Sequence, residues 1–199
     1  MRPSAISDSD VTVPHTPNDR ADILPALGEL FREHGYEGTS LALITQKTGL
    51  GKGSLYHFFP GGKEEMAAAV LAHIDEWFER HLFEDLRNEA DAHAAIHAMF
   101  RTVDAYFLSG RRVCLVGAFA LGGVRDRYAG RINAYFAVWI DTLAAALRRA
   151  GKPRAAARFA AEDAVAMIQG ALVAARALDD AAVFRRALKR AEVRLFAAA

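Results

Sequence analysis

A stretch between positions 38 and 63 combines cationic and hydroxyl side chains with a complete lack of acids. It holds three lysines and no Asp or Glu, although the whole chain has a formal net charge of only +1. Lysine can neutralise a phosphate, Tyr56 and His57 can donate to phosphate oxygens, and Ser54 is short enough to reach a base edge. The local charge therefore indicates a nucleic-acid contact. The candidate DNA-binding residues are Arg20, Thr39, Ser40, Lys52, Gly53, Ser54, Tyr56, His57 and Lys63.

Two short helices are needed to present these side chains. Thr39 and Ser40 can cap the first helix, and Leu41 and Ile44 follow at the spacing of an inward face. Gly49 can adopt the positive φ that ends this helix. The chain then restarts within a few residues, which is the length of a turn between two packed helices.

The second helix is predicted at residues 51–59. It can bury Leu55 together with Phe58 or Phe59, while its polar residues face outward, and Pro60 ends it. The pair predicts a helix-turn-helix, whose second helix enters the major groove of DNA.

Residues 20–66 resemble the DNA-binding domain of the TetR family of transcriptional regulators. The run KGSLYHFF at residues 52–59 matches the most characteristic run of that family. The variant FPGGKEE at residues 59–65 and the run CLVG at residues 114–117 are similar to the LmrA/YxaF-like subgroup. The resemblance implies an all-α homodimer of about nine helices. Three N-terminal helices would form the DNA-binding domain, and the others a ligand-binding and dimerisation domain.

The first helix departs from the family pattern at Pro25 and Gly28. In a helix interior a proline costs about 3 kcal/mol and a glycine about 1 kcal/mol. We therefore expect the helix to begin near Asp22, which leaves Pro25 in or just beyond the first turn. A kink at Pro25 is the alternative.

The chain divides into three parts. Residues 1–18 lack apolar periodicity and predict a flexible tail, residues 19–64 a helix-turn-helix domain, and residues 65–199 a ligand-binding and dimerisation domain. Apolar residues recur at steps of three and four in the last part. The helices predicted there cover residues 63–87, 91–108, 114–121, 125–150, 154–178 and 180–198.

Composition bounds the class of protein. A chain of 199 residues that is 52% hydrophobic can bury a substantial core. The single cysteine excludes an intramolecular disulfide and fits a reducing cytoplasm. No uncharged apolar run is long enough to cross a bilayer, so we expect a cytoplasmic protein without membrane contact. No nucleophile beside a base and no carboxylate pair is recognisable, which predicts neither enzymatic activity nor a cofactor.

Aromatic and sulfur-bearing side chains are concentrated in the middle of the chain. Such stripes usually form a core, and only the family analogy favours a mostly apolar cavity. On that analogy we expect a small hydrophobic or planar effector, with Gln169 as a candidate polar contact. The candidate ligand-binding residues are Trp77, Met99, Phe100, Val103, Phe107, Cys114, Phe119, Tyr135, Trp139 and Met167.

The last two predicted helices are the candidate dimer interface, mainly because the resemblance implies it. Their small residues allow close approach, although the same residues could pack within one subunit. Two recognition helices roughly 34–36 Å apart would suit a palindromic operator. The candidate interface residues are Phe159, Ala160, Asp163, Met167, Gly170, Ala174, Phe184 and Leu188.

Three other patterns carry weaker hypotheses. The glycine-rich residues 49–54 resemble a phosphate-binding loop, but they lack the Walker spacing and a preceding strand. His93 and His97 have the spacing of a metal pair, yet an exposed polar face explains them more simply. Cys114 is a redox sensor only if its thiolate is stabilised.

These features predict a ligand-responsive transcriptional regulator, in the first instance a repressor. A dimer would bind a palindromic double-stranded DNA operator, and a hydrophobic or planar effector would release it. The alternative is a constitutive DNA-binding regulator of the same fold that binds no small molecule.

Overall fold

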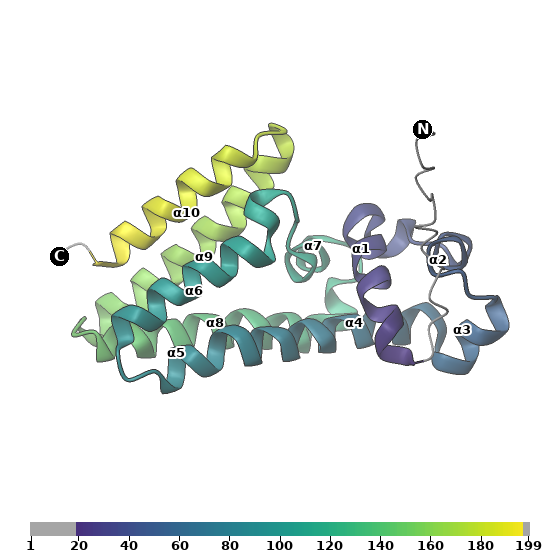
Figure 1. Ribbon diagram of the computed structural model, residues 1–199, viewed down its shortest axis with the longest axis horizontal. Helices are drawn as coiled ribbons and strands as arrows, with labels where there is room; N and C mark the ends of the chain where they lie inside the picture. The colour runs from purple at the N-terminus through teal and green to yellow at the C-terminus, as the bar shows by residue number, and fades with distance from the viewer. Residues whose placement is uncertain (1–18, 197–199) are drawn as a thin grey trace, which may run out of the picture.

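The computed structural model describes residues 19–196, which form helices joined by short turns (Figure 1). The tail predicted at residues 1–18 lies outside the described residues. Three helices come first, and a long fourth helix runs from them into the rest of the molecule (Figure 1). They are α1 (Arg20–Gly38), α2 (Leu41–Thr48), α3 (Lys52–Phe58) and α4 (Gly62–Phe78).

The fourth helix continues through a π-helical turn. The segment η1 (Glu79–Phe83) joins α4 to α5 (Glu84–Asn88) without a break in the helical backbone. The single helix predicted at residues 63–87 is therefore present, with a π-turn inside it. When these three segments are counted as one, residues 19–196 contain nine α-helices, as predicted.

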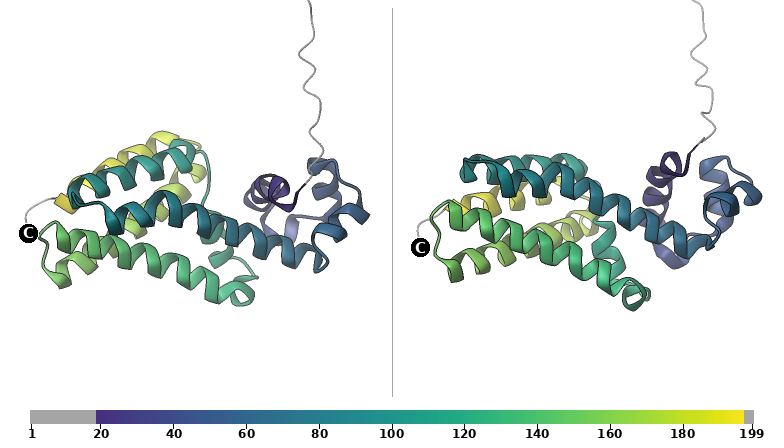
Figure 2. Two further views of the ribbon diagram at one scale, coloured as in Figure 1. Left: turned by 60° about the horizontal axis from the view of Figure 1, so that its bottom comes forward. Right: turned by 90° about the horizontal axis from the view of Figure 1, so that it is seen from below.

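The remaining helices form a bundle beside the far half of the fourth helix, and α10 lies along α9 (Figures 1 and 2). Two short 3-10 turns precede α7 and α8. The elements are α6 (Ala92–Tyr106), η2 (Leu108–Gly110), α7 (Leu115–Leu121), η3 (Arg125–Tyr128), α8 (Ala129–Arg149), α9 (Arg154–Ala177) and α10 (Ala181–Phe196).

The start of α1 differs from the prediction. The Asp19 carboxylate accepts a hydrogen bond from the Ala21 N–H at 3.0 Å, and the Asp22 carboxylate accepts one from the Asp19 N–H at 3.3 Å. This reciprocal cap starts the helix at Arg20, two residues earlier than predicted. Pro25 therefore lies in the second turn, where it removes the N–H that would donate to the Ala21 carbonyl, and the backbone there stays helical.

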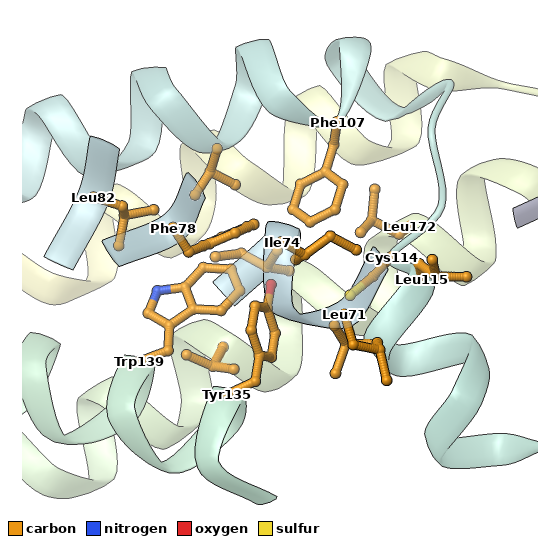
Figure 3. Close-up of a cluster of buried hydrophobic side chains, with 14 of the residues drawn as sticks. Leu71, Ile74, Phe78, Leu82, Phe107, Cys114, Leu115, Tyr135, Trp139 and Leu172 are labelled. Carbon is orange, nitrogen blue, oxygen red and sulfur yellow. The ribbon is translucent and has the colours of Figure 1, made fainter. Parts of the chain in front are cut away.

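A cluster of aromatic rings fills the centre of the bundle (Figure 3). Phe78 of α4 meets the rings of Tyr135 and Trp139 of α8, with centroids 5.0 and 5.5 Å apart. Aromatic pairs at such distances add about 0.5–1.5 kcal/mol beyond the burial of apolar area. The cluster therefore fastens the fourth helix to the bundle.

Within residues 19–196 no helix combines the length and the apolar character that a membrane crossing requires.

Candidate DNA-binding surface and ligand pocket

The helix-turn-helix has the local structure predicted for it. Ser40 caps α2, because its hydroxyl oxygen accepts a hydrogen bond from the Leu43 N–H at 3.2 Å. Gly49 ends α2 with a φ of 71°, in the left-handed region that favours glycine. Leu55 and Phe59 are fully buried and anchor α3 to the helices beneath it.

The outward side of α3 carries most of the candidate DNA contacts. The helix lies at the opposite end of the molecule from the last turn of α10 (Figure 1). Tyr56 is 46% exposed, and its ring packs over Gly62, where an added Cβ would lie 3.5 Å from the ring. The exposed residues of this surface are Ser40, Lys52, Gly53, Ser54, Tyr56 and His57. They form one face without acids, which suits an approach to phosphates.

Thr39 is buried, so its side chain cannot contact DNA as predicted. Its hydroxyl donates to the carbonyls of Leu30 and Gly35, with oxygen–oxygen distances of 3.2 and 2.6 Å. These carbonyls belong to the end of α1, where the helix leaves acceptors unpaired. Thr39 therefore ends α1, whereas Ser40 alone caps α2.

Arg20 and Lys63 are held by partners within the chain. Arg20 forms an ion pair with Glu65 at 2.9 Å and stacks on the Phe59 ring at 4.6 Å. Lys63 Nζ donates to the backbone carbonyl of Tyr36 at 3.0 Å and lies 4.5 Å from the centroid of the Tyr36 ring. A surface ion pair contributes about 0–1 kcal/mol, so exchanging Glu65 for a phosphate would cost Arg20 little.

Aromatic and charged contacts around Tyr36 join α1 to the rest of the molecule. The Tyr36 hydroxyl accepts from Arg127 at 3.2 Å, and Arg127 also pairs with Glu64 at the start of α4. The Tyr128 hydroxyl donates to the Glu64 carbonyl at 3.2 Å. The Phe119 ring of α7 contacts Tyr36 edge to face. The DNA-binding helices are therefore held by α7 and η3 as well as by α4.

A second junction joins α1 to the segment between η2 and α7 through one carboxylate. Glu29 accepts hydrogen bonds from Arg32 at 2.7 Å and from Arg112 Nε at 3.1 Å. Arg32 also donates to the Tyr106 hydroxyl at 3.0 Å. Two guanidinium groups thus share one carboxylate, which leaves a net positive charge at this junction.

A pocket of about 610 Å³ that opens to the surface lies among α7, α8 and α9, with α1 contributing Arg32. Its walls are mostly apolar, as in sites for small organic molecules. The lining residues are Arg32, Val113, Cys114, Gly117, Ala118, Ala120, Leu121, Phe136, Gln169, Gly170, Leu172, Val173, Arg176 and Ala177.

Of the ten candidate ligand-binding residues, Cys114 alone lines this cavity. Trp77 lines a separate cavity of about 420 Å³ among α1, α4 and α6. The others pack into the core or, for Met167, against it, because aromatic rings fill the space between helices rather than surround it. The residues placed in the core rather than in the cavity wall are Met99, Phe100, Val103, Phe107, Phe119, Tyr135 and Trp139.

Sequence reasoning missed Arg32, Gly117 and Arg176 as cavity residues and named Gln169 only as a polar candidate. A glycine inside the apolar helix α7 was the available signal. A Cβ at Gly117 would lie 3.0 Å from the Gln169 Oε1 atom, so the glycine admits the glutamine side chain.

Cys114 has the environment of an unreactive thiol. Burial raises its pKa, and the Gly117 N–H that donates to its sulfur at 3.3 Å only partly opposes that rise. Reactive cysteines need a stabilised thiolate. The redox hypothesis therefore lacks its physical requirement.

The candidate dimer residues separate into two groups. Phe159 leaves 67% of its surface exposed on α9, and Asp163 and Gly170 are also exposed, whereas Ala160, Met167 and Ala174 are half-buried. Phe184 is fully buried and Leu188 is 7% exposed, so both pack within their own subunit. Phe184 cannot serve as an interface side chain in this fold, because its ring lies against Gly110 and Phe107.

The histidine pair also has a structural explanation. His93 and His97 stack on the Phe196 ring with centroids 5.3 and 4.6 Å away, and His97 pairs with Glu192 at 2.7 Å. No group of three or more His, Cys, Asp or Glu side chains suited to a metal ion occurs among residues 19–196.

The chain matches family models over both of its parts. Residues 23–70 match the model described as bacterial regulatory proteins, tetR family, and residues 92–190 match the model described as transcriptional regulator LmrA/YxaF-like, C-terminal domain.

Curated relatives agree with these matches. The HTH-type transcriptional regulator LmrA of Bacillus subtilis (strain 168) is 29% identical over 162 residues, which cover 78% of this chain and 85% of LmrA. The uncharacterized regulator YxaF of the same strain is 33% identical over 90 residues, or 45% of this chain and 47% of YxaF.

Solved structures share the fold. A TetR-family regulator from Agrobacterium tumefaciens is 25% identical, with a TM-score of 0.77 over 89% of this chain and 97% of that one. A cysteine mutant of the TetR-family regulator CifR, solved with a 26 bp double-stranded operator DNA, is 26% identical, with a TM-score of 0.72 over 87% and 95% of the two chains. TetR-family regulators are DNA-binding proteins and not enzymes. The chain belongs to the TetR family of DNA-binding transcriptional regulators, with a C-terminal domain of the LmrA/YxaF-like type.

Proposed function

We propose that this protein is a ligand-released repressor that binds a palindromic operator as a homodimer. The observation that carries the proposal is the acid-free outer face of α3, which stands on a helix-turn-helix fixed by buried Leu55 and Phe59. CifR, which has the same fold, binds operator DNA.

In the proposed complex α3 lies in the major groove. Lys52 and Tyr56 contact phosphates and set the register, while Ser54 and its neighbours read base edges. The first turn of α3 has no side-chain cap, because Gly51 precedes it.

The dimer is proposed to form through the outward face of α9. Phe159 and Val173 expose 67% and 59% of their surfaces there, and the small residue Gly170 between them allows a partner helix to approach. The outer face of α10 is basic, so it contributes less to contact with an identical copy. Its exposed cations are Arg185, Arg186, Lys189, Arg190 and Arg194.

Effector binding is proposed to act through α7. This helix lines the cavity with Gly117 and contacts Tyr36 of α1 with Phe119. A ligand that prefers a different position of α7 would shift the dimer toward a state whose α3 helices no longer match the half-sites. A thousandfold loss of DNA affinity requires about 4 kcal/mol of coupling.

The first test is a fluorescence-anisotropy titration against the DNA upstream of the protein's own gene, at fixed salt and with competitor DNA. Lys52→Ala and Tyr56→Phe should each weaken selective binding at least tenfold without changing the melting temperature. Lys189→Ala on α10 is the matched control and should bind like the wild type. Selective binding that neither variant weakens would exclude this contact assignment.

A constitutive regulator without a ligand is the competing function. The cavity of about 610 Å³ argues for a ligand. Thermal stabilisation by members of a panel of planar hydrophobic compounds, together with release of the operator, would favour the ligand-responsive form. Operator binding that no compound changes would favour the constitutive one.

A further inference from the structure

The cavity among α7, α8 and α9 has an uneven charge. Two arginines, Arg32 and Arg176, are among its lining residues, and no Asp or Glu is. The remaining wall is apolar apart from Cys114 and Gln169. An apolar pocket with cations and no anions in its wall favours a ligand that carries a negative charge, because charge-assisted hydrogen bonds to arginine are stronger than neutral ones.

Two buried donors in the wall of this cavity lack acceptors. Arg32 exposes only 8% of its side chain, and its Nε atom has no hydrogen-bond partner although both terminal nitrogens have one. The Gln169 Nε2 atom is likewise buried without a hydrogen-bond partner, and the Oε1 atom of the same amide lies toward Gly117. A buried donor without an acceptor costs about 1–3 kcal/mol, so each is a position where a ligand oxygen would gain stability.

Both donors belong to one end of the cavity. A Cβ built on Gly117 would lie 3.0 Å from the Gln169 Oε1 atom and 3.6 Å from the Cys114 sulfur, so the Gln169 amide lies beside Cys114, and Arg32 lines the same pocket. Figure 3 shows the Cys114 sulfur and the Tyr135 hydroxyl pointing into the same interior region, and that hydroxyl is also buried without a partner. The buried residues Arg32 and Cys114 therefore mark the inner end of the pocket, while Leu121 and Val173, which are 84% and 59% exposed, mark its opening.

We propose that the effector of this protein is an apolar molecule with a carboxylate, which is bound by Arg32 and Gln169 at the inner end of the cavity. The proposal rests on the proposed function, since it names the ligand class of the same regulator. One carboxylate oxygen accepts from Arg32 Nε and the other from Gln169 Nε2, while the hydrocarbon body contacts Phe136 and Leu172.

The charge at the α1 junction favours a carboxylate over a neutral carbonyl. Glu29 is shared between Arg32 and Arg112, so it neutralises only one of the two guanidinium groups. A carboxylate that binds Arg32 supplies the second negative charge. A cationic ligand would meet repulsion from the same groups.

The test uses the full-length wild-type protein and three compounds of nearly equal shape. Isothermal titration calorimetry is run with 2-naphthoate, 2-naphthamide and 2-naphthylmethylamine at one pH and salt concentration. We expect 2-naphthoate to bind at least tenfold more tightly than the amide, and the amine to bind most weakly. Equal affinity for acid and amide, or the tightest binding for the amine, would overturn the proposal.

Two variants locate the carboxylate. Gln169→Leu keeps an apolar side chain of similar size and should reduce naphthoate affinity at least tenfold while leaving naphthamide affinity within threefold. Arg176→Gln at the pocket wall should reduce naphthoate affinity by less than Gln169→Leu does. The control for Arg176→Gln is Arg148→Gln, because Arg148 is an exposed arginine on α8 outside the pocket. Naphthoate binding that Gln169→Leu leaves unchanged would overturn the assigned site even if Arg32 variants failed to fold.

An operator titration with the same proteins separates this proposal from the proposed function. Tight, Gln169-dependent binding of naphthoate supports the ligand class even if the operator is not released, and that result would count against the repressor mechanism alone. Selective operator binding together with no calorimetric binding of any naphthyl compound would overturn the ligand class and leave DNA binding intact.

Discussion

The rings of Tyr36 and Phe119 meet edge to face, with centroids 6.1 Å apart and planes at 88°. Tyr36 belongs to α1, under the helix-turn-helix, and Phe119 belongs to α7, which lines the pocket with Gly117. Both rings are buried. One contact therefore connects a cavity wall to the DNA-binding helices, and a displacement of α7 cannot leave α1 unaffected because packed interiors transmit strain.

Replacing Phe119 should separate ligand binding from operator release. Phe119→Leu removes the edge-to-face contact while keeping an apolar side chain, so we expect a stability loss of about 1–3 kcal/mol and near wild-type operator affinity. The loss of DNA affinity caused by a saturating effector should shrink at least tenfold. The measurement is operator affinity by anisotropy with and without effector.

Leu178→Ala is the control for that experiment, because it removes an apolar side chain that is 67% exposed at the end of α9. It should respond to the effector like the wild type. Full release of the operator in Phe119→Leu would show that coupling passes through another contact, such as the junction of Glu29 with Arg112.

Gly110 cannot be replaced without disturbing Phe184. Its φ is 96°, and an added Cβ would lie only 2.5 Å from the Phe184 Cβ. Gly110→Ala combines backbone strain with a clash against a fully buried ring, so we expect it to lower the free energy of unfolding by about 3 kcal/mol or more. Urea unfolding followed by circular dichroism measures the change.

Gly123→Ala provides the comparison for this prediction, because an added Cβ there meets no atom within 4 Å. Its free energy of unfolding should stay within about 1 kcal/mol of the wild type. Equal effects of the two alanines would mean that Gly110 relaxes easily and that the close approach of Phe184 is not a constraint.

The helix-turn-helix was predictable from sequence because its determinants are local. A capping serine, the glycine at position 49 and the burial of Leu55 with Phe59 act within a few residues of one another. Thr39 was predicted wrongly because the same local sequence allows its hydroxyl either to cap α2 or to bond to the last carbonyls of α1. The hydroxyl donates to the carbonyls of Leu30 and Gly35, whose positions depend on where α1 ends.

The cavity was not predictable for the opposite reason. It lies between side chains from α1, α7, α8 and α9, so its position depends on how four helices pack. Aromatic spacing selects buried residues well, as Trp139 and Phe107 illustrate, but it does not distinguish a ring that fills space from one that borders a cavity. The dimer-interface prediction failed at Phe184 for the same reason. The ring is buried by packing against Gly110, which is 74 residues away in sequence.

The Cys114 thiol should be protected from chemical labelling in the native protein. Burial raises its pKa from 9.0, and the residue is 7% exposed, so both thiolate population and access are low. Labelling by 5,5′-dithiobis(2-nitrobenzoate) at pH 8 should be at least a hundredfold slower than in urea-unfolded protein. A bound effector should slow it further, since Cys114 lines the cavity. Native labelling as fast as in urea would contradict the packed α7 that the effector proposals assume.

Asp75 should make stability depend on pH in the acidic range. Burial raises the pKa of this α4 carboxyl above 3.8, and the pairing with Arg131 of α8 at 3.3 Å only partly opposes the rise. The native state therefore holds its proton at pH values where the unfolded chain has lost it, so stability falls as pH rises from about 3.8 to the raised value.

Asp75→Asn lacks this titration, and its stability relative to the wild type should increase across that pH range and then level off. Glu76→Gln removes a neighbouring negative charge that also raises the Asp75 pKa. It should therefore shorten the pH range over which the free energy of unfolding falls. Urea unfolding at closely spaced pH values measures both effects, and parallel curves for the wild type and Asp75→Asn would mean that the carboxyl titrates alike in the folded and unfolded chains.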